Sequence, residues 1–364
     1  MKKQVVYAII MIVALVLFAV MIIINPGETV PGEAVRYKKK IPFTKVPADS
    51  NLSFRRNRLI GKGMNFGNAL EAPREGDWGL TIRKSYIKTI AKAGFNSVRL
   101  PVCWPAHTDS VPPYSIDPVF LKRVDRILGW CFRRNMAVVI TIHHFNKLYE
   151  EPLNDTLRQT FFSIWKQLST HYLGTEPDRL IFELLNEPHG NLTPERWNEL
   201  IPEVLQAVRK IDTNRTLILD VPDWAFHENL PLLKIPDKEQ NVIVSTRYYL
   251  PYDFTHQGAH WVKNSNQWSG SRWTGTEAEK AQVRKDMKFV TRWAQEHNRP
   301  ITIGEYGAII NAPENDRVTW TRYVRSQFEA NHFSWSYFDF GVTFRVYDIR
   351  DHSWLKGFPE AFFK

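Results

Sequence analysis

Cysteine is scarce in this sequence, with only Cys103 and Cys131 among 364 residues. These two residues form no CxxC motif and lack the Cys/His spacing of a zinc site, which argues against a structural zinc or a redox pair. A small disulfide-stapled scaffold is excluded on the same grounds. The chain must therefore be held together by a hydrophobic core.

A large excess of one charge is also missing from most of the chain. The net charge is +10, but residues 1–62 carry +8 of it, which leaves only +2 for the other 302 residues. The basic N-terminal stretch lacks the interleaved aromatic residues of a nucleic-acid groove. We therefore expect no nucleic-acid partner, and we expect this stretch to lie near anionic headgroups or surface polymers.

Long hydrophobic runs are absent with one exception. Residues 5–24 are twenty consecutive apolar residues behind Lys2 and Lys3. The run is long enough to cross a hydrocarbon core of roughly 30 Å and is longer than the apolar region of a cleaved signal peptide. We predict a short basic segment at 1–4, an uncleaved transmembrane signal anchor at 5–24, a basic stalk at 25–57 and one packed domain at 58–364.

The GxGxxG fingerprint of dinucleotide-binding folds is missing as well. Instead, short apolar runs rich in β-branched residues alternate with amphipathic helical patterns. Helices are expected near residues 82–93, 118–134, 156–172, 194–211, 276–297 and 317–331. Strands are expected within residues 58–67, 96–101, 137–144, 179–188, 216–222, 241–249, 301–308 and 333–340. This alternation predicts an α/β fold of the (β/α)8 TIM-barrel type.

Two of the expected strands end at a glutamate. The run LIFELLNEP leads to Glu187, and the run ITIGEYGA contains Glu305. In a barrel, side chains at the carboxyl ends of the strands meet at one rim. Acid/base cleavage of a glycosidic bond requires two carboxyl groups placed in this way. The sequence therefore predicts that Glu187 and Glu305 are the catalytic pair of a glycosidase.

Polar residues at neighbouring strand ends are expected to support this pair. Arg99 can keep Glu305 ionised through its opposite charge, and Tyr249 can orient the same carboxylate. Asn186, beside Glu187, can hydrogen-bond a sugar hydroxyl.

Strand alternation separates structural residues from candidate ligands. Glu183 falls on the same face as Glu187 but deeper in the barrel, where we expect a structural ion pair with Arg99. His143 and His144 are adjacent, so at most one should point into the cleft unless the strand has already ended. Because no third ligand has a suitable spacing, the pair predicts contacts to sugar rather than a metal site.

Tryptophan is frequent in the expected strand-end loops, where large exposed rings are unusual for packing alone. The residues concerned are Trp78, Trp104, Trp224, Trp261, Trp268 and Trp273. Pyranose rings stack on indole faces, so these loops favour a polymeric sugar as ligand. Half of the six are expected to pack in the core or the loops instead, so we rank Trp224 and Trp261 above the others.

Several ordered blocks of the sequence carry a family resemblance over about residues 58–350. They are GKGMNFGNALEAPREGDWG, VRLPVCW, ITIHHFN, FELLNEPHGNLT, RYYLPYDFTHQGAHW and IGEYGA. In these blocks the chain resembles glycoside hydrolase family 5, the cellulase family. The resemblance implies a retaining endo-β-glucanase on a (β/α)8 fold without a cofactor. It places Glu187 in the acid/base position and Glu305 in the nucleophile position.

The same resemblance extends the candidate site beyond the two glutamates. The residues that match the set around the pair are Arg99, His143, His144, Asn186 and Tyr249. Asn68 and Glu71 match residues that bind sugar on the non-reducing side of the cleavage point.

Two positions depart from the family pattern. Arg247 stands where the family usually has histidine, which places a permanent cation near the site. We expect it to overstabilise the Glu305 carboxylate and weaken this nucleophile. Phe338 stands where tryptophan is usual, so an aromatic face remains but the indole N–H donor is lost.

Together these observations predict a membrane-anchored, monomeric endo-β-1,4-glucanase that cleaves β-glucan by double displacement. We expect its domain on the extracytoplasmic side of the membrane, at the cell surface or in the periplasm. One alternative is a non-catalytic glycan-binding protein whose site has degenerated at Arg247 and Phe338. Another is a β-mannanase or a different hemicellulase on the same fold.

Overall fold

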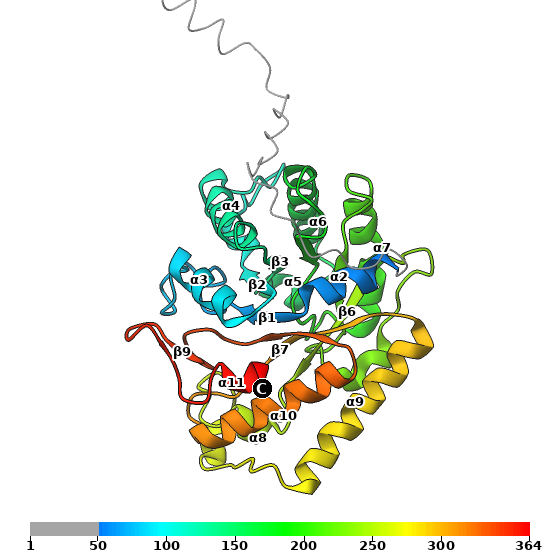
Figure 1. Ribbon diagram of the computed structural model, residues 1–364. Helices are drawn as coiled ribbons and strands as arrows, with labels where there is room; N and C mark the ends of the chain where they lie inside the picture. The colour runs from blue at the N-terminus through cyan, green and yellow to red at the C-terminus, as the bar shows by residue number, and fades with distance from the viewer. Residues whose placement is uncertain (1–50) are drawn as a thin grey trace, which may run out of the picture.

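The computed structural model describes residues 51–364, and Figure 1 shows their arrangement. The predicted transmembrane anchor at 5–24 and most of the predicted stalk lie outside the described residues. Within residues 51–364, no helix combines the length and the apolar character that crossing a bilayer requires.

Eight parallel strands close into a barrel in the order in which they occur in the chain. They are β1 (Lys62–Asn65), β2 (Ser97–Val102), β3 (Ala137–Ile142), β4 (Leu180–Glu183), β5 (Leu217–Asp220), β6 (Val242–Tyr248), β7 (Ile301–Tyr306) and β8 (Ser334–Tyr337). Strand β1 pairs with both β2 and β8, which closes the cylinder. The predicted (β/α)8 barrel is confirmed.

Helices surround the barrel and connect successive strands (Figure 1). The connecting helices are α3 (Lys84–Ala93), α4 (Pro118–Phe132), α5 (Asn146–Glu150), α6 (Asp155–His171), α7 (Pro194–Arg209), α8 (Tyr252–Thr255), α9 (Glu277–His297) and α10 (Glu314–Ala330). Local sequence sets their ends. Helix α9, for example, begins with a capping box between Thr276 and Glu279 and ends at Asn298 in the left-handed conformation.

The remaining short elements fill the loops and the end of the chain. They are the 3-10 helices η1 (Trp104–His107), η2 (His227–Leu232) and η3 (Ser265–Trp268), the antiparallel pair β9 (Tyr347–Asp348) and β10 (Ser353–Trp354), and helix α11 (Glu360–Phe363). Between β5 and β6 the described chain has η2 and no α-helix, as the irregular sequence there suggests.

Helix α2 (Leu52–Ile60) was not expected from the sequence, which assigned residues up to 57 to the stalk. Asn51 caps the helix by accepting from Ser53 N–H. Asn57 Nδ2 donates to the Ile301 carbonyl at 2.9 Å, and Arg56 Nη1 donates to Thr216 Oγ1 at 2.8 Å. The helix therefore covers the end of the barrel where the strands begin. Its polar sequence hides this role, because its buried polar side chains bond to the strands.

Two layers of side chains fill the inside of the barrel. The lower layer is apolar and consists of Ile60, Ala137, Val139, Ile181, Ile218 and Ile243. The layer above it is polar and buried, and it includes Asn65, Arg99, Thr141, Glu183, Asp220 and Ser245. Because strand residues alternate in direction, residues 137, 139 and 141 of β3 all point inward. The change from apolar to polar along β3, β4, β5 and β6 places polar and charged groups just beneath the rim where the strands end.

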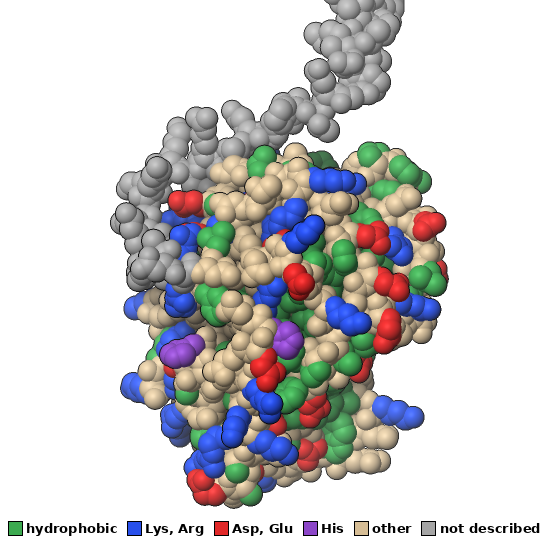
Figure 2. Space-filling view, turned by 90° about the vertical axis from the view of Figure 1, so that its right-hand side faces the viewer, with side chains coloured by type: hydrophobic (Ala, Val, Ile, Leu, Met, Phe, Trp, Pro, Cys, Tyr) green, Lys and Arg blue, Asp and Glu red, His purple; other side chains and the backbone are tan. Residues whose placement is uncertain are grey.

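The surface of the domain is mixed in charge. Figure 2 shows basic and acidic side chains interspersed with hydrophobic ones over the described residues of one face. This pattern fits the near-neutral composition outside the N-terminal stretch.

Candidate active site

A cleft of about 960 Å³ opens at the rim where the strands end. Most of the predicted site residues line it, namely Asn68, Glu71, His143, His144, Glu187, Trp224, Arg247, Tyr249, Trp261, Glu305 and Phe338. The other two, Arg99 and Asn186, lie buried and bond to residues that line the cleft. The structure thus brings all thirteen predicted residues to one place.

Glu187 reaches the cleft through a break in its strand. Strand β4 ends at Glu183, and Leu184 and Leu185 both pack into the hydrophobic core. Glu187 has a φ of 46°, in the left-handed region. Its N–H donates to Asp220 Oδ2 at 2.8 Å, which holds this turn. Strict alternation along the strand predicted that Glu187 points into the barrel mouth. It does so, but because of this turn and not because the strand continues.

Glu305 enters the cleft through an irregularity in β7. The register with β6 shifts between Thr246 and Arg247, so that Arg247 pairs with Glu305. Such a bulge re-aims a side chain. Gly304 leaves room for the side chains beside it, since an added Cβ would force Arg247 Nη1 and Ser245 Oγ to shift.

The two glutamates face each other across Arg247. Arg247 Nε lies 3.1 Å from Glu187 Oε1 and 3.6 Å from Glu305 Oε1. The two carboxyl oxygens cannot be farther apart than the sum of these distances. That limit lies near the lower end of the roughly 6.5–9.5 Å range of inverting glycosidases and admits the roughly 5–5.5 Å of retaining ones.

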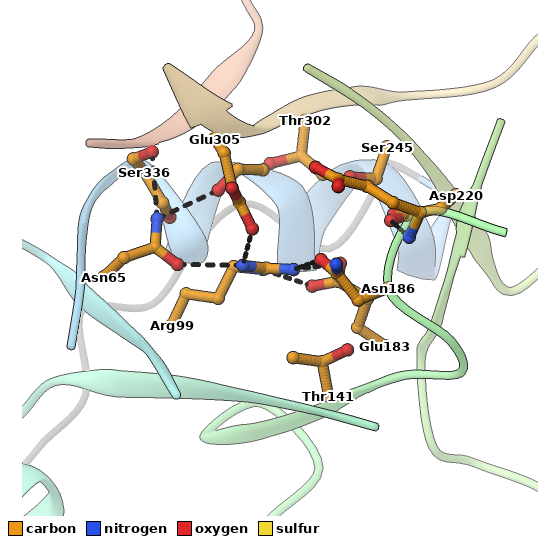
Figure 3. A network of polar contacts seen from close by, with 12 residues as sticks. Asn65, Arg99, Thr141, Glu183, Asn186, Asp220, Ser245, Thr302, Glu305 and Ser336 are labelled. Atoms are coloured by element: carbon orange, nitrogen blue, oxygen red, sulfur yellow. Dashed lines mark hydrogen bonds and ion pairs between the residues drawn. The ribbon is translucent and has the colours of Figure 1, made fainter. Parts of the chain in front are cut away.

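Glu305 is held by donors that suit its carboxylate form. Arg99 Nη1 donates to Glu305 Oε1 at 2.6 Å, and Tyr249 OH donates to Oε2 at 3.0 Å. Figure 3 shows the Arg99 guanidinium below Glu305, with Asn65 on one side and Asn186 and Glu183 on the other. These are the contacts that the sequence predicted for Arg99 and Tyr249.

Glu187 lies in a different environment. Burial, followed by the neighbouring charge of Glu305, raises the pKa of Glu187 to about 7, and Arg247 and Arg99 oppose this shift. Glu187 therefore retains a proton near neutral pH. Glu305 accepts hydrogen bonds from the Arg99 guanidinium and the Tyr249 hydroxyl. A pair of carboxyl groups with divergent environments is the arrangement that acid/base chemistry needs.

Glu183 is confirmed as a structural ion pair. Its two oxygens accept from Arg99 Nε and Nη2, each at 2.6 Å, and Oε1 also accepts from Arg247 Nη2 at 3.0 Å. Burial would raise the pKa of Glu183, but the two guanidinium groups outweigh it and lower the pKa to about 2. Glu183 is fully buried and therefore out of reach of a sugar.

Arg247 forms ion pairs with both catalytic candidates. Its only hydrogen bond to either catalytic candidate goes from Nε to Glu187 Oε1. The rest of the guanidinium donates to Asp220, Glu183, Asn186 and Ser245. Contacts to Glu305 are limited to the 3.6 Å approach of Nε. Arg247 is nevertheless within ion-pair distance of Glu305, so the expected overstabilisation of this carboxylate stays a prediction.

Both histidines line the cleft, because β3 ends at Ile142 just before them. His143 is buried and His144 is exposed, and their rings meet edge to face with centroids 4.5 Å apart. Burial lowers the pKa of both, that of His143 most strongly, so both are neutral imidazoles at pH 7. Within residues 51–364, no group of three or more His, Cys, Asp or Glu side chains is arranged to hold a metal ion.

Asn68 and Glu71 form one corner of the cleft with Asp339. Glu71 accepts from the N–H groups of Asn68 and Ala69, and Asn68 Nδ2 donates to Asp339 Oδ2 at 3.0 Å. Burial raises the pKa of Glu71 to about 8. Phe338 lies next to this corner, because an added Cβ at Gly67 would overlap its ring.

Three of the six tryptophans present rings to the cleft. Trp78, Trp224 and Trp261 line it, with 42%, 46% and 49% of their surface exposed. Trp224 also stacks on His189, with ring centroids 3.5 Å apart. Trp104 and Trp273 are fully buried and therefore belong to the part of the set that packs in the core.

The fourth ring outside the core, Trp268, does not line the cleft and meets Tyr252 edge to face.

Several residues of the site were missed from the sequence. Asp220 at the end of β5 is the most important, because it binds both Glu187 N–H and Arg247. Alternation in TLILDVP places Ile218 and Asp220 on the same inward face, which was the available signal. The cleft is also lined by Tyr252, His256, His260, Lys263 and Phe344, which lie in the segments after β6 and β8, whose paths the sequence does not reveal.

Comparisons with known proteins agree with this geometry. The family model described as cellulase (glycosyl hydrolase family 5) matches residues 60–342. The fold matches that of Cel5A from Thermotoga maritima, solved with cellobiose, with a TM-score of 0.83 and 41% identity over 85% of this chain and 99% of that one. Cellulose synthase subunit Z from Clostridioides difficile matches with a TM-score of 0.80 and 33% identity over 84% of this chain and all of that one.

Among curated relatives, endoglucanase H of Acetivibrio thermocellus is 33% identical over 78% of this chain. The chain spans only 30% of the length of that protein, and 52% of the length of endoglucanase 3 from Fibrobacter succinogenes. The family match nevertheless covers nearly the whole barrel and both glutamates. The chain therefore belongs to glycosyl hydrolase family 5, the cellulase family.

Proposed function

We propose that this protein is a retaining endo-β-1,4-glucanase that hydrolyses β-glucan by double displacement. The observation that carries the proposal is the placement of Glu187 and Glu305 on either side of Arg247, where burial and the charge of Glu305 raise the pKa of Glu187 to about 7. Similarity to endoglucanases and to Cel5A supports the same reaction class.

In the proposed first step, the Glu305 carboxylate attacks the anomeric carbon while Glu187 donates its proton to the leaving oxygen. Arg99 and Tyr249 fix the attacking carboxylate, since each donates to one of its oxygens. In the second step, Glu187 removes a proton from water, which attacks the glycosyl–Glu305 ester. The ester bond breaks, and both glutamates return to their starting states.

A polymer is the substrate that best fits the shape of the cleft. The open cleft of about 960 Å³ carries exposed indole rings, including those of Trp224 and Trp261. Stacking against several rings binds an extended chain of sugars rather than one residue, which favours internal cleavage.

The polymer itself is tested with a panel of soluble polysaccharides. We expect residues 51–364 to release reducing ends from carboxymethylcellulose or mixed-linkage β-glucan at least about tenfold faster than from mannan or xylan, a preference of about 1.4 kcal/mol in the transition state. A faster rate on mannan would favour the β-mannanase alternative, for which Cel5A provides a precedent because it has been solved with mannotriose. Tight binding of cello-oligosaccharides without turnover over hours would favour the non-catalytic alternative.

We also propose that residues 5–24 tether the enzyme to a membrane, with the domain on the extracytoplasmic side. The support is the run of twenty apolar residues behind two lysines. The full chain is expected to sediment with membranes and to resist extraction by carbonate, while the chain lacking residues 1–50 stays in the supernatant. External protease should digest the domain in intact spheroplasts. Recovery of the full chain in the supernatant would contradict the tether.

A further inference from the structure

Asp220 lies beneath the catalytic candidates, where it bonds directly to the Glu187 backbone and reaches the two carboxyl groups through Arg247. Its side chain is fully buried at the end of β5. Oδ2 accepts from Arg247 Nη2 at 2.6 Å and from Glu187 N–H at 2.8 Å, and Oδ1 lies 3.4 Å from Arg247 Nη1. This carboxylate thus binds the guanidinium that touches Glu187 and also the backbone that carries Glu187.

Arg247 alone would work against the proposed role of Glu187. Its Nε donates to Glu187 Oε1 at 3.1 Å, and a permanent cation at hydrogen-bond distance favours the ionised form of a carboxyl group. A general acid must keep its proton until the leaving oxygen takes it. Burial and the charge of Glu305 already oppose this arginine, and a further negative charge bound to its guanidinium would add to their effect.

Asp220 can compensate because of its charge. Burial, and to a smaller extent the neighbouring Glu183, raise the pKa of Asp220 above its usual range, against the opposing effect of the Arg247 guanidinium and the Glu187 N–H. Since both of these neighbours donate to its oxygens, we assign Asp220 the ionised form. The buried cluster then holds two cations, Arg99 and Arg247, and three carboxylates, Glu183, Asp220 and Glu305.

With Glu187 protonated, this cluster carries one net negative charge. Without the charge of Asp220 it would be neutral, and Glu187 would lose its proton more readily. A neutral side chain at position 247 would also give one net negative charge without any help from Asp220. The aspartate therefore offsets the charge that Arg247 adds.

Other titratable groups around Glu187 do not supply this charge. Tyr149 from α5 and Tyr249 and Tyr252 from the chain after β6 interact with it, and burial raises the pKa of all three, so they stay neutral. Burial lowers the pKa of His189, whose Nδ1 lies 2.5 Å from the Glu187 carbonyl oxygen. The charged groups that face Glu187 are Arg99, Arg247, Asp220 and Glu305.

We propose that Asp220 is a positioning residue that engages Arg247 and thereby keeps Glu187 available as the proton donor. The proposal rests on the proposed function, in which Glu187 is the acid/base residue. It assigns a purpose to a buried aspartate that touches no part of the cleft surface.

The test is the pH dependence of kcat/KM on a soluble β-glucan. In the unmodified protein the rate should fall as pH rises through about 7, because Glu187 loses its proton there. Asp220→Asn should move this basic limb to lower pH by about one unit, the scale of a single neighbouring charge. Arg247→His alone should move it to higher pH, and the double variant should return it close to its starting position.

A matched control separates this role from plain stability. Asp212 is a buried aspartate that pairs with Arg215 at the opposite end of the barrel, with 2.9 Å between Oδ2 and Nη2. Asp212→Asn should lower the melting temperature and leave the basic limb in place. If Asp220→Asn behaves in the same way, or if the Arg247→His limb does not rise, the proposal is wrong.

The proposed function can fail independently of this inference. Absence of hydrolysis by the unmodified protein on every β-glycan would remove the proposed function. The effect of Asp220 on Glu187 would then be measured by 13C NMR, as the pH titration of the Glu187 side-chain carboxyl signal. This signal is assigned by its absence from the spectrum of Glu187→Gln. An unchanged Glu187 titration in Asp220→Asn would overturn the inference whether or not the protein is active.

Discussion

Glu187→Gln and Glu305→Gln should each reduce hydrolysis of a soluble β-1,4-glucan by about 10³-fold or more. Removing a single stabilising donor typically costs about 10²–10³-fold in rate, and each of these changes removes a group that takes part in bond making or breaking. An amide at position 305 cannot attack the anomeric carbon. An amide at position 187 cannot transfer a proton to the leaving oxygen.

The two variants are expected to differ on an activated substrate. In an aryl cellobioside made from a strongly acidic phenol, the phenolate leaves without needing a proton. Glu187→Gln should therefore still form the glycosyl–enzyme ester and release a burst of the phenol. Glu305→Gln should release none. The control is Glu203→Gln, an exposed glutamate of α7 that pairs with Arg158, which should leave both rates unchanged. Near-normal polysaccharide hydrolysis by either active-site variant would refute the assignment of the pair.

The barrel was predictable because its signals are local and repeated. Each strand is a short apolar run, each helix has its own amphipathic pattern, and the eightfold alternation admits few closed arrangements. Helix α2 was not predictable on this basis. Its sequence contains Arg55, Arg56 and Arg58, and its place in the fold depends on hydrogen bonds to residues more than 150 positions away.

The site was predictable where a residue stands at the end of a regular strand. The break after Glu183 and the register shift before Glu305 were not, because each depends on a backbone conformation set by neighbouring strands. Asp220 was missed since the sequence offers no partner for it. Its importance follows from Arg247, a residue of the next strand that reaches the same buried space.

Arg99 connects the structural and the reacting parts of this network. It donates five hydrogen bonds, to Glu183 (two), Asn186, Asn65 and Glu305, and it is fully buried. Breaking a buried ion pair by removing one partner typically costs roughly 3–5 kcal/mol, because the other charge is left without compensation. A change at this position should therefore affect stability and rate together.

Arg99→Met should lower the free energy of unfolding by about 3–5 kcal/mol at pH 7, measured with a chemical denaturant. The deficit should shrink as pH falls. In the unmodified protein the pKa of Glu183 is lowered from its usual 4.5 to about 2, so its contribution is complete above pH 4.5 and is lost as pH falls toward 2. In the variant, Glu183 is buried without Arg99, so its protonated form is favoured. Low pH protonates it and thereby removes part of the loss of stability.

Arg99→Met/Glu183→Gln separates the two roles of the arginine. The second change removes the uncompensated carboxylate, so much of the lost stability should return. The rate should not return, because Glu305 still lacks the donor that lies 2.6 Å from its Oε1, and a loss of about 10²–10³-fold in kcat is expected to persist. If rate and stability recover together, Arg99 serves only to hold the barrel. If stability recovers alone, the bond from Arg99 to Glu305 acts directly on the reacting carboxylate.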